Sequence, residues 1–414
     1  MLRPRRMLRV GYESGAARMK AVILAAGEGA RMGPFTASEP KVMIPVGNRP
    51  ILEYVVQALV DNGVQDVVLV VGYRRERILS HFQEGKAFGA RIRYVTQTKQ
   101  LGTAHAVAEA RPHLEDRFVV LNGSNMVDAR FVGDLIEQAK GPAVVITQSD
   151  RPRQYGVVTL QGSRVVSITE KPTQMISNLI NTGAYALDAS IFTDIERLAA
   201  EGKNDLPSAI NAHAASQDVL ALRTEGMWID ALYPWDLLRL NQAAIASTAD
   251  VRAGTIESNV TIRGRVAVGD GCTIRSGAYL QGPLSLGAGC EIGPNAVLLP
   301  STSLGRNVRI GALTTVANSI LMDDVSLGAS SVVQDSVIGS GVSAKAGLMA
   351  ASGPADVKIE DEWHAVPQIG ALLGEDAEFG SGVTIESGSI VNERTRVASG
   401  ARIRGTVPAG GVVL

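Results

Sequence analysis

Aliphatic residues recur at every sixth position through the first part of the C-terminal region of this chain. The eleven successive positions are Ile256, Ile262, Val268, Ile274, Leu280, Leu286, Ile292, Leu298, Leu304, Ile310 and Val316. An α-helix, with about 3.6 residues per turn, cannot keep such a set on one face. A three-sided coil can, because one aliphatic side chain per face fills its interior while small residues and glycines permit the corners. The pattern therefore predicts an all-β, left-handed parallel β-helix of hexapeptide repeats.

The same pattern sets the limits of this C-terminal domain. It continues to Val333, shifts register, and resumes from Leu373 to Ile403. We therefore expect the β-helix to cover residues 249–414, with an interruption at about residues 345–366.

Residues 19–248 show a different pattern, in which apolar runs at 67–71, 118–121 and 143–146 alternate with longer amphipathic stretches. This alternation predicts an α/β, Rossmann-like domain with a parallel-rich sheet, which binds ligands beyond the carboxyl ends of its strands. Residues 1–18 contain five arginines and one acidic residue, and they lack the apolar centre of a secretory signal. We expect them to be a disordered or mis-started extension.

Charge and cysteine content restrict the partners of the protein. A formal net charge of -1 gives no reason to expect nucleic acid or an anionic membrane as a partner. No apolar run approaches the roughly 20 residues of a membrane-spanning helix. Cys272 and Cys290 lie eighteen residues apart, which is one full coil, so we expect small buried residues on neighbouring rungs rather than a redox pair. These features favour a cytoplasmic protein.

A glycine-rich loop follows the first expected strand at residues 21–25. The loop is Gly27-Glu28-Gly29-Ala30-Arg31-Met32-Gly33, and its backbone amides could approach phosphates because the glycines lack a Cβ. A dinucleotide-binding fingerprint would need glycine in place of Met32, and a P-loop would end in Gly-Lys-Ser/Thr, so both alternatives are disfavoured. Arg31 and Lys41 are cations that could stabilise phosphate charge, although isolated cations are more often solvated.

Several segments occur in an order that resembles the signature of nucleoside-triphosphate:sugar-1-phosphate transferases. They are residues 24–32 with Pro40-Lys41, residues 97–106, Tyr155-Gly156, Glu170-Lys171-Pro172, Asn181-Thr182-Gly183 and Trp228-Ile229-Asp230. From residue 19 to its end, the chain resembles the bifunctional N-acetylglucosamine-1-phosphate uridylyltransferase/glucosamine-1-phosphate acetyltransferases and their archaeal-type relatives. The resemblance implies a nucleotide-diphospho-sugar transferase domain and a homotrimer formed through the β-helix.

The resemblance also implies a role for each matched residue. Arg31 and Lys41 would stabilise the α-phosphate and the departing pyrophosphate, and Asp230 would bind Mg²⁺. The substrate-binding residues would be Leu24, Ala25, Ala26, Gly27, Gln97, Gly102, Thr103, Gly123, Gly156, Glu170, Lys171 and Asn181. The implied reaction joins UTP or dTTP to a sugar-1-phosphate, and the expected product is UDP-N-acetylglucosamine or a related UDP- or dTDP-sugar. Taken alone, Glu170 could instead be a solvated strand end and Asn181 a turn residue.

One expected metal ligand departs from the family pattern. Relatives carry an aspartate where this chain has Ser124. A hydroxyl is a poorer ligand for a hard dication than a carboxylate, so turnover should fall unless Asp128, four residues later, compensates through a shifted loop. An alternative hypothesis is therefore a catalytically impaired nucleotide-sugar-binding or regulatory subunit.

The β-helix departs from the same family in its late interruption. This segment lacks the histidine motif that relatives use for acetyl transfer, and Ser381 stands where they carry an asparagine. We interpret His364 as an exposed loop histidine and do not predict acetyltransferase activity. A purely acetyl-transferring protein is the weakest of the three hypotheses.

Overall fold

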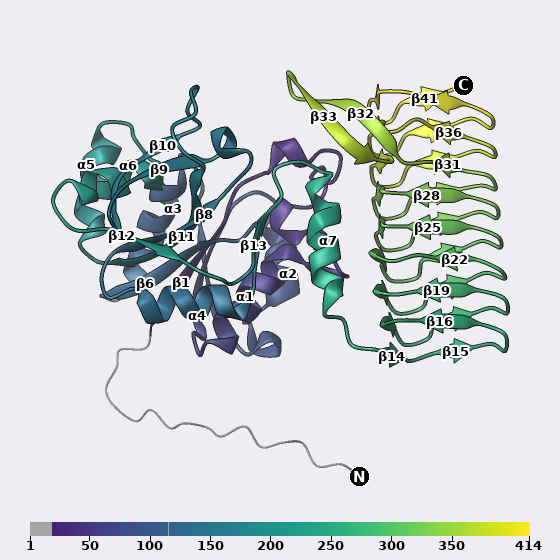
Figure 1. Ribbon diagram of the computed structural model, residues 1–414, viewed down its shortest axis with the longest axis horizontal. Helices are drawn as coiled ribbons and strands as arrows, with labels where there is room; N and C mark the ends of the chain where they lie inside the picture. Colours follow the sequence, from purple (N-terminus) through teal and green to yellow (C-terminus); the bar gives the residue numbers. More distant parts are fainter. Residues whose placement is uncertain (1–18, 115) are drawn as a thin grey trace, which may run out of the picture.

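The computed structural model describes residues 19–114 and 116–414, so the expected extension at residues 1–18 lies outside the described residues. Two domains lie side by side in Figure 1. The α/β domain is coloured purple to teal, and a regular stack of short strands is coloured green to yellow. The α/β domain packs against the side of the stack rather than against one of its ends.

A nine-stranded sheet forms the centre of the α/β domain. Its strands, in spatial order, are β5 (Arg91–Thr96), β4 (Asp66–Val71), β1 (Lys20–Ala25), β6 (Arg117–Asn122), β11 (Leu179–Asp188), β8 (Ala143–Gln148), β12 (Leu220–Arg223), β10 (Arg164–Glu170) and β9 (Gly156–Gln161). The strands from β5 to β6 are parallel, as the sequence predicts. The rest of the sheet is mixed, because β11 runs antiparallel to both β6 and β8.

Helices cover both faces of this sheet, which explains the almost continuous apolar character of β1. Ala21 and Ile23 pack on one face with α1 (Ile51–Asp61) and α4 (Ala129–Gln138), whereas Val22 packs on the other. The other helices are α2 (Arg75–Phe82), α3 (Thr103–Ala110), α5 (Ile191–Ala200), α6 (Leu206–Ala214), α7 (Asp236–Ala246) and the 3-10 helices η1 (Ala30–Met32), η2 (Lys41–Met43), η3 (Lys86–Phe88), η4 (Arg111–His113) and η5 (Pro152–Gln154). Two small ladders join β2 (Pro45–Val46) to β3 (Arg49–Pro50) and β7 (Asn125–Val127) to β13 (Trp228–Asp230).

Three parallel sheets form the walls of the stack, which is a parallel β-helix. The first sheet contains β14 (Val251–Arg252), β17 (Val266–Val268), β20 (Leu284–Leu286), β23 (Thr302–Leu304), β26 (Ile320–Leu321), β29 (Val337–Ile338), β34 (Leu372–Leu373), β37 (Ile390–Val391) and β40 (Thr406–Val407). The second contains β15 (Thr255–Ile256), β18 (Thr273–Ile274), β21 (Glu291–Ile292), β24 (Arg309–Ile310), β27 (Ser326–Leu327), β30 (Ser343–Ala344), β35 (Glu378–Phe379), β38 (Arg396–Val397) and β41 (Val412–Val413). The third contains β16 (Thr261–Arg263), β19 (Tyr279–Gln281), β22 (Val297–Leu298), β25 (Thr315–Ala317), β28 (Val332–Gln334), β31 (Met349–Ala350), β36 (Thr384–Ile385) and β39 (Arg402–Ile403).

Strand pairing explains where the six-residue pattern slips. Ile274 lies beside Ile292, eighteen positions later, whereas Leu304 lies beside Leu321, only seventeen positions later. One residue is missing from the turn that follows Val316, so the next inward position comes five residues on. The inward aliphatic side chains nevertheless form one continuous buried core.

An antiparallel hairpin interrupts the stack and consists of β32 (Gly353–Ile359) and β33 (Glu362–Ile369). It begins later than the expected residue 345, because β31 at Met349–Ala350 still forms a rung of the stack. The aliphatic pattern fades earlier because alanine fills the inward position at Ala344, where the next coil supplies Phe379. Figure 1 shows the hairpin leaning from the upper part of the stack toward the α/β domain.

The two cysteines lie on neighbouring coils, as the sequence predicts, because the strands that follow them, β18 and β21, are paired. Both thiols are free and buried. Cys272 Sγ donates to Gly287 O at 3.0 Å, and Cys290 Sγ donates to Gly305 O at 3.1 Å. They therefore fill corners of the coil as small buried residues.

Helix α7 and the first sheet of the β-helix form much of the contact between the domains (Figure 1). One apolar cluster contains residues of α7 together with outward-facing side chains of this sheet. The sheet residues are Ile320, Val337, Leu372 and Ile390. Fully buried Asn241 of α7 accepts hydrogen bonds from Gly47 N at 2.8 Å and Ser303 Oγ at 2.7 Å, and it donates to Ser301 O at 2.9 Å. The two domains thus share an apolar core and buried polar contacts.

Candidate functional site

Two adjoining cavities open where β1 and β6 end. Leu24, Thr103 and Asn122 line both of them. We call the larger one, about 400 Å³, the loop cavity, and the smaller one, about 170 Å³, the sheet cavity. Their position matches the ligand-binding edge expected for a parallel α/β sheet.

The loop cavity collects the N-terminal residues that the sequence singles out. Its lining includes the predicted residues Leu24, Ala25, Ala26, Gly27, Lys41, Gln97, Gly102 and Thr103, together with Gly29, Gln100, Asn122 and Ser124. Gly29 has φ +76°, and a Cβ there would lie 2.6 Å from the Cβ of Lys41. The loop therefore needs glycine to pass over Lys41.

Gln97, Gly102 and Thr103 build one wall of the loop cavity. Gln97 is buried, and its Nε2 donates to Gly102 O and lies 3.0 Å from His105 Nδ1. Thr103 Oγ1 accepts a hydrogen bond from Leu206 N at 2.8 Å, which fixes the start of α6 against α3. The amide nitrogen of Gln97 is thus already engaged within the protein.

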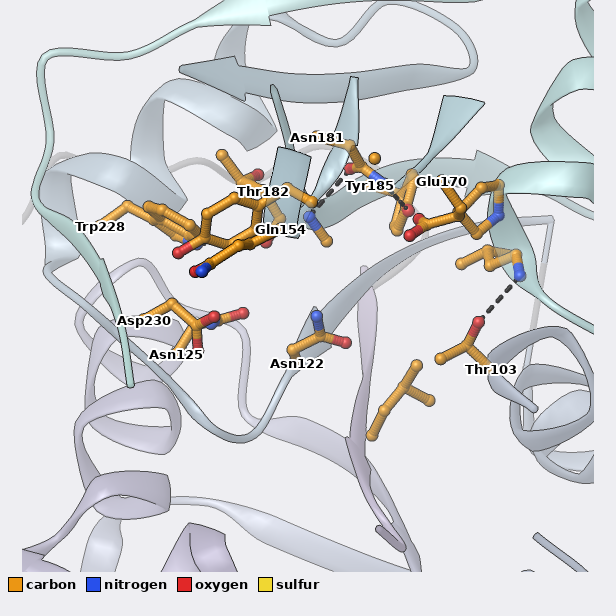
Figure 2. Close-up of a pocket in the computed structure, with 16 residues that line it drawn as sticks. Thr103, Asn122, Asn125, Gln154, Glu170, Asn181, Thr182, Tyr185, Trp228 and Asp230 are labelled. Carbon is orange, nitrogen blue, oxygen red and sulfur yellow. Dashed lines mark hydrogen bonds between the residues drawn. The ribbon is translucent and has the colours of Figure 1, made fainter. Parts of the chain in front are cut away.

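The sheet cavity, shown in Figure 2, is rich in polar side chains. The predicted residues Gly156, Glu170, Asn181 and Asp230 line it, together with Asn125, Gln154, Tyr155, Thr182, Gly183, Tyr185 and Trp228. Gly156 pairs with Glu170 across β9 and β10, and a Cβ on Gly156 would lie 2.7 Å from Glu170 Oε1. Glycine at this position therefore leaves room for the carboxylate.

Asn181 and Glu170 present hydrogen-bonding groups in this cavity. Asn181 Oδ1 accepts from Gly183 N at 2.9 Å, and its Nδ2 donates to Tyr185 Oη at 2.6 Å. Partial loss of hydration raises the pKa of Glu170. Figure 2 shows both residues at one end of the cavity, opposite the end occupied by Asp230.

Asp230 occupies a buried position beside a lysine. It lies on β13, where it is the cross-strand partner of Asn125 on β7. Lys41 Nζ is 3.4 Å from Asp230 Oδ1, and both side chains are largely buried. Asn125 Oδ1 is also buried and accepts no hydrogen bond from the described residues. Figure 2 places Asp230 and Asn125 next to each other at the same end of the sheet cavity.

The structure gives no support to compensation by Asp128. Its carboxylate caps α4 by accepting a hydrogen bond from Phe131 N at 2.8 Å, and it is not among the described residues that line either cavity. Ser124 lines the loop cavity, as expected for its place after β6. Within residues 19–114 and 116–414, no group of three or more His, Cys, Asp or Glu residues could hold a metal ion.

Three predicted residues are not among those described as lining the cavities. Arg31 Nε lies 3.6 Å from Glu360 Oε2 at the tip of the β32–β33 hairpin. Lys171 follows β10 in an exposed turn with φ +41°. Gly123 donates its N–H to Leu24 O at 2.9 Å and so helps to hold the ends of β6 and β1 together.

The interpretation of His364 as an exposed loop histidine is wrong. This residue lies within β33, and only 15% of its side chain is exposed. Its ring centroid is 4.3 Å from that of Tyr233 and 5.8 Å from that of Trp235. The hairpin folds back onto the α/β domain, which covers most of a side chain that the interrupted period assigned to an exposed loop.

Four polar residues of the sheet cavity, namely Asn122, Asn125, Gln154 and Tyr185, are not among those predicted from the sequence. Asn122 carried a signal, because a polar residue directly after a buried parallel strand points to the ligand-binding edge. The other three carried no comparable signal. They reach the cavity through an antiparallel ladder, a 3-10 turn and the antiparallel strand β11.

None of the helices in the described part of the chain combines the length and apolar character needed to cross a membrane. A family model described as "Nucleotidyl transferase" matches residues 20–246, and one described as "GMPPB C-terminal domain" matches residues 280–395.

Two archaeal relatives match almost the whole chain. "Bifunctional protein GlmU" of Methanococcus maripaludis strain C5 is 34% identical over 398 residues, covering 92% of this chain and 95% of that protein. The "Bifunctional sugar-1-phosphate nucleotidylyltransferase/acetyltransferase" of Sulfurisphaera tokodaii is 31% identical and covers 95% of this chain and 99% of that one. Among solved structures, a putative glucose-1-phosphate thymidylyltransferase from Bacillus anthracis matches with a TM-score of 0.51 and 28% identity, over 57% of this chain and 98% of that chain.

Proposed function

We propose, from the premise that this chain belongs to the nucleotidyl transferase family and is a sugar-1-phosphate nucleotidylyltransferase, that it joins UTP or dTTP to N-acetylglucosamine-1-phosphate or a related sugar-1-phosphate. Pyrophosphate is the second product. The observation that carries this proposal is the pair of adjoining cavities that share Leu24, Thr103 and Asn122. A two-substrate transfer needs two subsites that meet at the reacting atoms.

The nucleotide takes the loop cavity in this proposal. The backbone amides of the glycine-rich turn after β1 can approach the triphosphate, because Gly27 and Gly29 have no Cβ that would stand in the way. The base lies against the wall formed by Gln97, Gly102 and Thr103. Support for a pyrimidine base comes from the resemblance of residues 97–106 to the base-reading segment of uridylyl- and thymidylyltransferases.

The sugar-1-phosphate takes the sheet cavity. Glu170 and Asn181 offer a carboxylate and an amide, which suit the hydroxyl groups or the acetamido group of a sugar. This placement directs the sugar phosphate toward the shared wall, where it can attack the α-phosphorus of the nucleotide. Lys41 stabilises the charge that develops on the phosphates, as a point charge at the boundary of both cavities.

Mg²⁺ fits the end of the sheet cavity formed by Asp230 and Asn125. Asn125 Oδ1 is a buried acceptor that lacks a donor among the described residues, and amide and carboxylate oxygens are both ligands of hard dications. Asp230 and Asn125 would therefore hold the ion. In relatives the second ligand is the aspartate at the position that Ser124 takes in this chain. A bound Mg²⁺ would neutralise charge on the phosphates of the transferring nucleotide.

We also propose that the protein is cytoplasmic and forms a homotrimer through the β-helix. The third sheet of the β-helix supports association, because it turns Tyr279, Val297, Val332 and Met349 outward on four of five successive strands, and Thr315 takes the equivalent place on the fifth, β25. Two free cysteines fit a reducing compartment. Light scattering of the purified protein tests the trimer directly.

The decisive experiment measures pyrophosphate release by purified protein with Mg²⁺, UTP, dTTP, ATP or GTP, and a panel of sugar-1-phosphates. We expect magnesium-dependent turnover with a pyrimidine nucleotide in the native chain. The variants Ser124→Asp and Ser124→Asn form a matched pair that differs in charge at one position. If the native chain binds nucleotide sugars without turnover and only the Ser124→Asp variant releases pyrophosphate, the protein is a catalytically impaired binding protein instead.

A further inference from the structure

The β32–β33 hairpin of the β-helix packs on the α/β domain beside the sheet cavity. Val357, Ile359 and Val366 of the hairpin share one buried apolar cluster with Met32 and Tyr233 of the α/β domain. The hairpin is therefore an insertion that extends the β-helix onto the transferase domain (Figure 1). Its contact carries more than apolar area, because a polar chain of residues leads from it into the cavity.

That polar chain begins at His364 on β33. Its ring lies 4.3 Å from the ring of Tyr233, which in turn stacks on Trp235 at 4.9 Å. Gln154 Nε2 donates a hydrogen bond to Tyr233 Oη at 3.2 Å, and Gln154 lines the sheet cavity. The His364 ring of the hairpin thus packs on Tyr233, whose hydroxyl group accepts the hydrogen bond from Gln154.

The Asp236 carboxylate bonds the backbone at Tyr233 and the side chain of Arg151, which lies near Gln154. Asp236 Oδ2 accepts from Leu232 N at 2.9 Å and from Tyr233 N at 3.0 Å. Asp236 Oδ1 accepts from Arg151, which precedes the η5 turn that carries Gln154. These bonds fix the backbone at Tyr233, and the hydrogen bond from Gln154 Nε2 ties the position of the Gln154 amide to that of the Tyr233 ring.

Gln154 has an unused hydrogen-bonding group. Its Oε1 is buried and accepts no hydrogen bond from any described residue. Leaving such an acceptor buried and unpaired is costly, so a donor is expected when the cavity fills. A sugar carries hydroxyl groups, and an amino sugar carries an amide N–H, which can supply that donor.

We propose that the hairpin positions Gln154 through His364 and Tyr233, so that Gln154 Oε1 accepts a hydrogen bond from the sugar moiety of the bound sugar-1-phosphate. His364 and Tyr233 are positioning residues in this arrangement, since neither needs to touch the substrate. The inference rests on the proposed placement of the sugar in the sheet cavity.

The first test compares three hairpin variants by their Michaelis constants for each substrate. His364→Ala should raise KM for the sugar-1-phosphate about fivefold, the loss expected for one misplaced hydrogen bond, and leave KM for the nucleotide unchanged. His364→Phe keeps a ring against Tyr233 and should restore the native KM. Trp363→Ala, at an exposed neighbour on the same strand, is the matched control and should change neither constant.

The second test is a double-mutant cycle between the hairpin and the α/β domain. Tyr233→Phe keeps the stacked ring but removes the oxygen that accepts from Gln154, so it should raise the same KM by a similar factor. Combined with His364→Ala, it should add little, because both variants break one chain of contacts. Additive effects, or equal changes in KM for both substrates, would overturn the proposal.

Calorimetric binding of the sugar-1-phosphate separates this inference from the proposed function. If the native chain binds the sugar-1-phosphate without turnover, the transfer reaction fails as a proposal, but His364→Ala should still weaken binding about fivefold. If binding is unchanged in His364→Ala and Tyr233→Phe, the hairpin does not position Gln154.

Discussion

The β-helix and the α/β domain differ in how many residues share one environment. In the β-helix, every inward position meets the same requirement, so side chains such as Ile274 and Ile292 are buried in equivalent places on successive coils. In the α/β domain, most cavity residues have an environment of their own, such as Asn181 between Gly183 and Tyr185. Repetition therefore makes the coil easy to predict from the sequence, whereas the transferase site depends on single residues.

The largest effect should come from a single residue of the site. Asp230→Asn should lower kcat for pyrophosphate release by about a hundred- to a thousandfold, because it removes the one carboxylate of the proposed metal site. Weaker binding of Mn²⁺, followed by electron paramagnetic resonance, should accompany the loss. Asp218→Asn, at an exposed ion pair with Arg164, is the control and should leave both unchanged. A variant that retains native Mn²⁺ binding would exclude Asp230 as a ligand.

A smaller effect should follow from deleting one inward side chain of the coil. Leu298 is fully buried, so Leu298→Ala should lower the free energy of unfolding by about 3 kcal/mol. Leu298 faces the interior of the coil and is not part of the apolar cluster shared with the α/β domain, so pyrophosphate release at low temperature should stay close to native. Glu291→Ala, at an exposed outward position on β21, should cost below about 1 kcal/mol in denaturant unfolding. Equal costs at the two positions would contradict the inward and outward assignment.

The smallest of the three effects concerns the contact between the two regions. Asn241→Ala should cost about 2 kcal/mol, because it leaves Gly47 N, Ser303 Oγ and Ser301 O without their buried partner. Calorimetry should then show the two domains unfolding further apart in temperature than in the native chain. Asn211→Ala breaks two comparable hydrogen bonds inside the α/β domain and should not separate the transitions.

The sequence predicts the coil better than its interruption. The period fails near Ala344 because an alanine takes an inward position that Phe379 complements from the next coil, a compensation between distant residues. The packing of the β-helix against the α/β domain is also visible in the sequence, in a pattern that the six-residue period does not include. Pairs of adjacent aliphatic residues, namely Ile320-Leu321, Val337-Ile338, Leu372-Leu373 and Ile390-Val391, place one side chain inward and one in the contact with the α/β domain.

The site could be predicted where local sequence determines local geometry. The turn after β1 and the segment from Gln97 to Thr103 lie as expected along the loop cavity. Arg31 could not be placed in this way, because its contact with Glu360 depends on how the hairpin returns to the α/β domain. The same tertiary packing covers most of the His364 side chain, and no local pattern distinguishes this residue from a loop residue.

The place where the hairpin leaves the stack makes the lower β-helix a spacer of fixed length. The α/β domain is attached through α7 near β23, and the hairpin emerges higher up, between β31 and β34. Each coil adds about 4.8 Å along the axis. One extra coil between these attachments would displace His364 from Tyr233 by more than their 4.3 Å ring separation, whereas extra coils after β37 would displace neither. Relatives that keep this hairpin contact should therefore keep the number of coils between these attachments, and their coil number can vary beyond the hairpin.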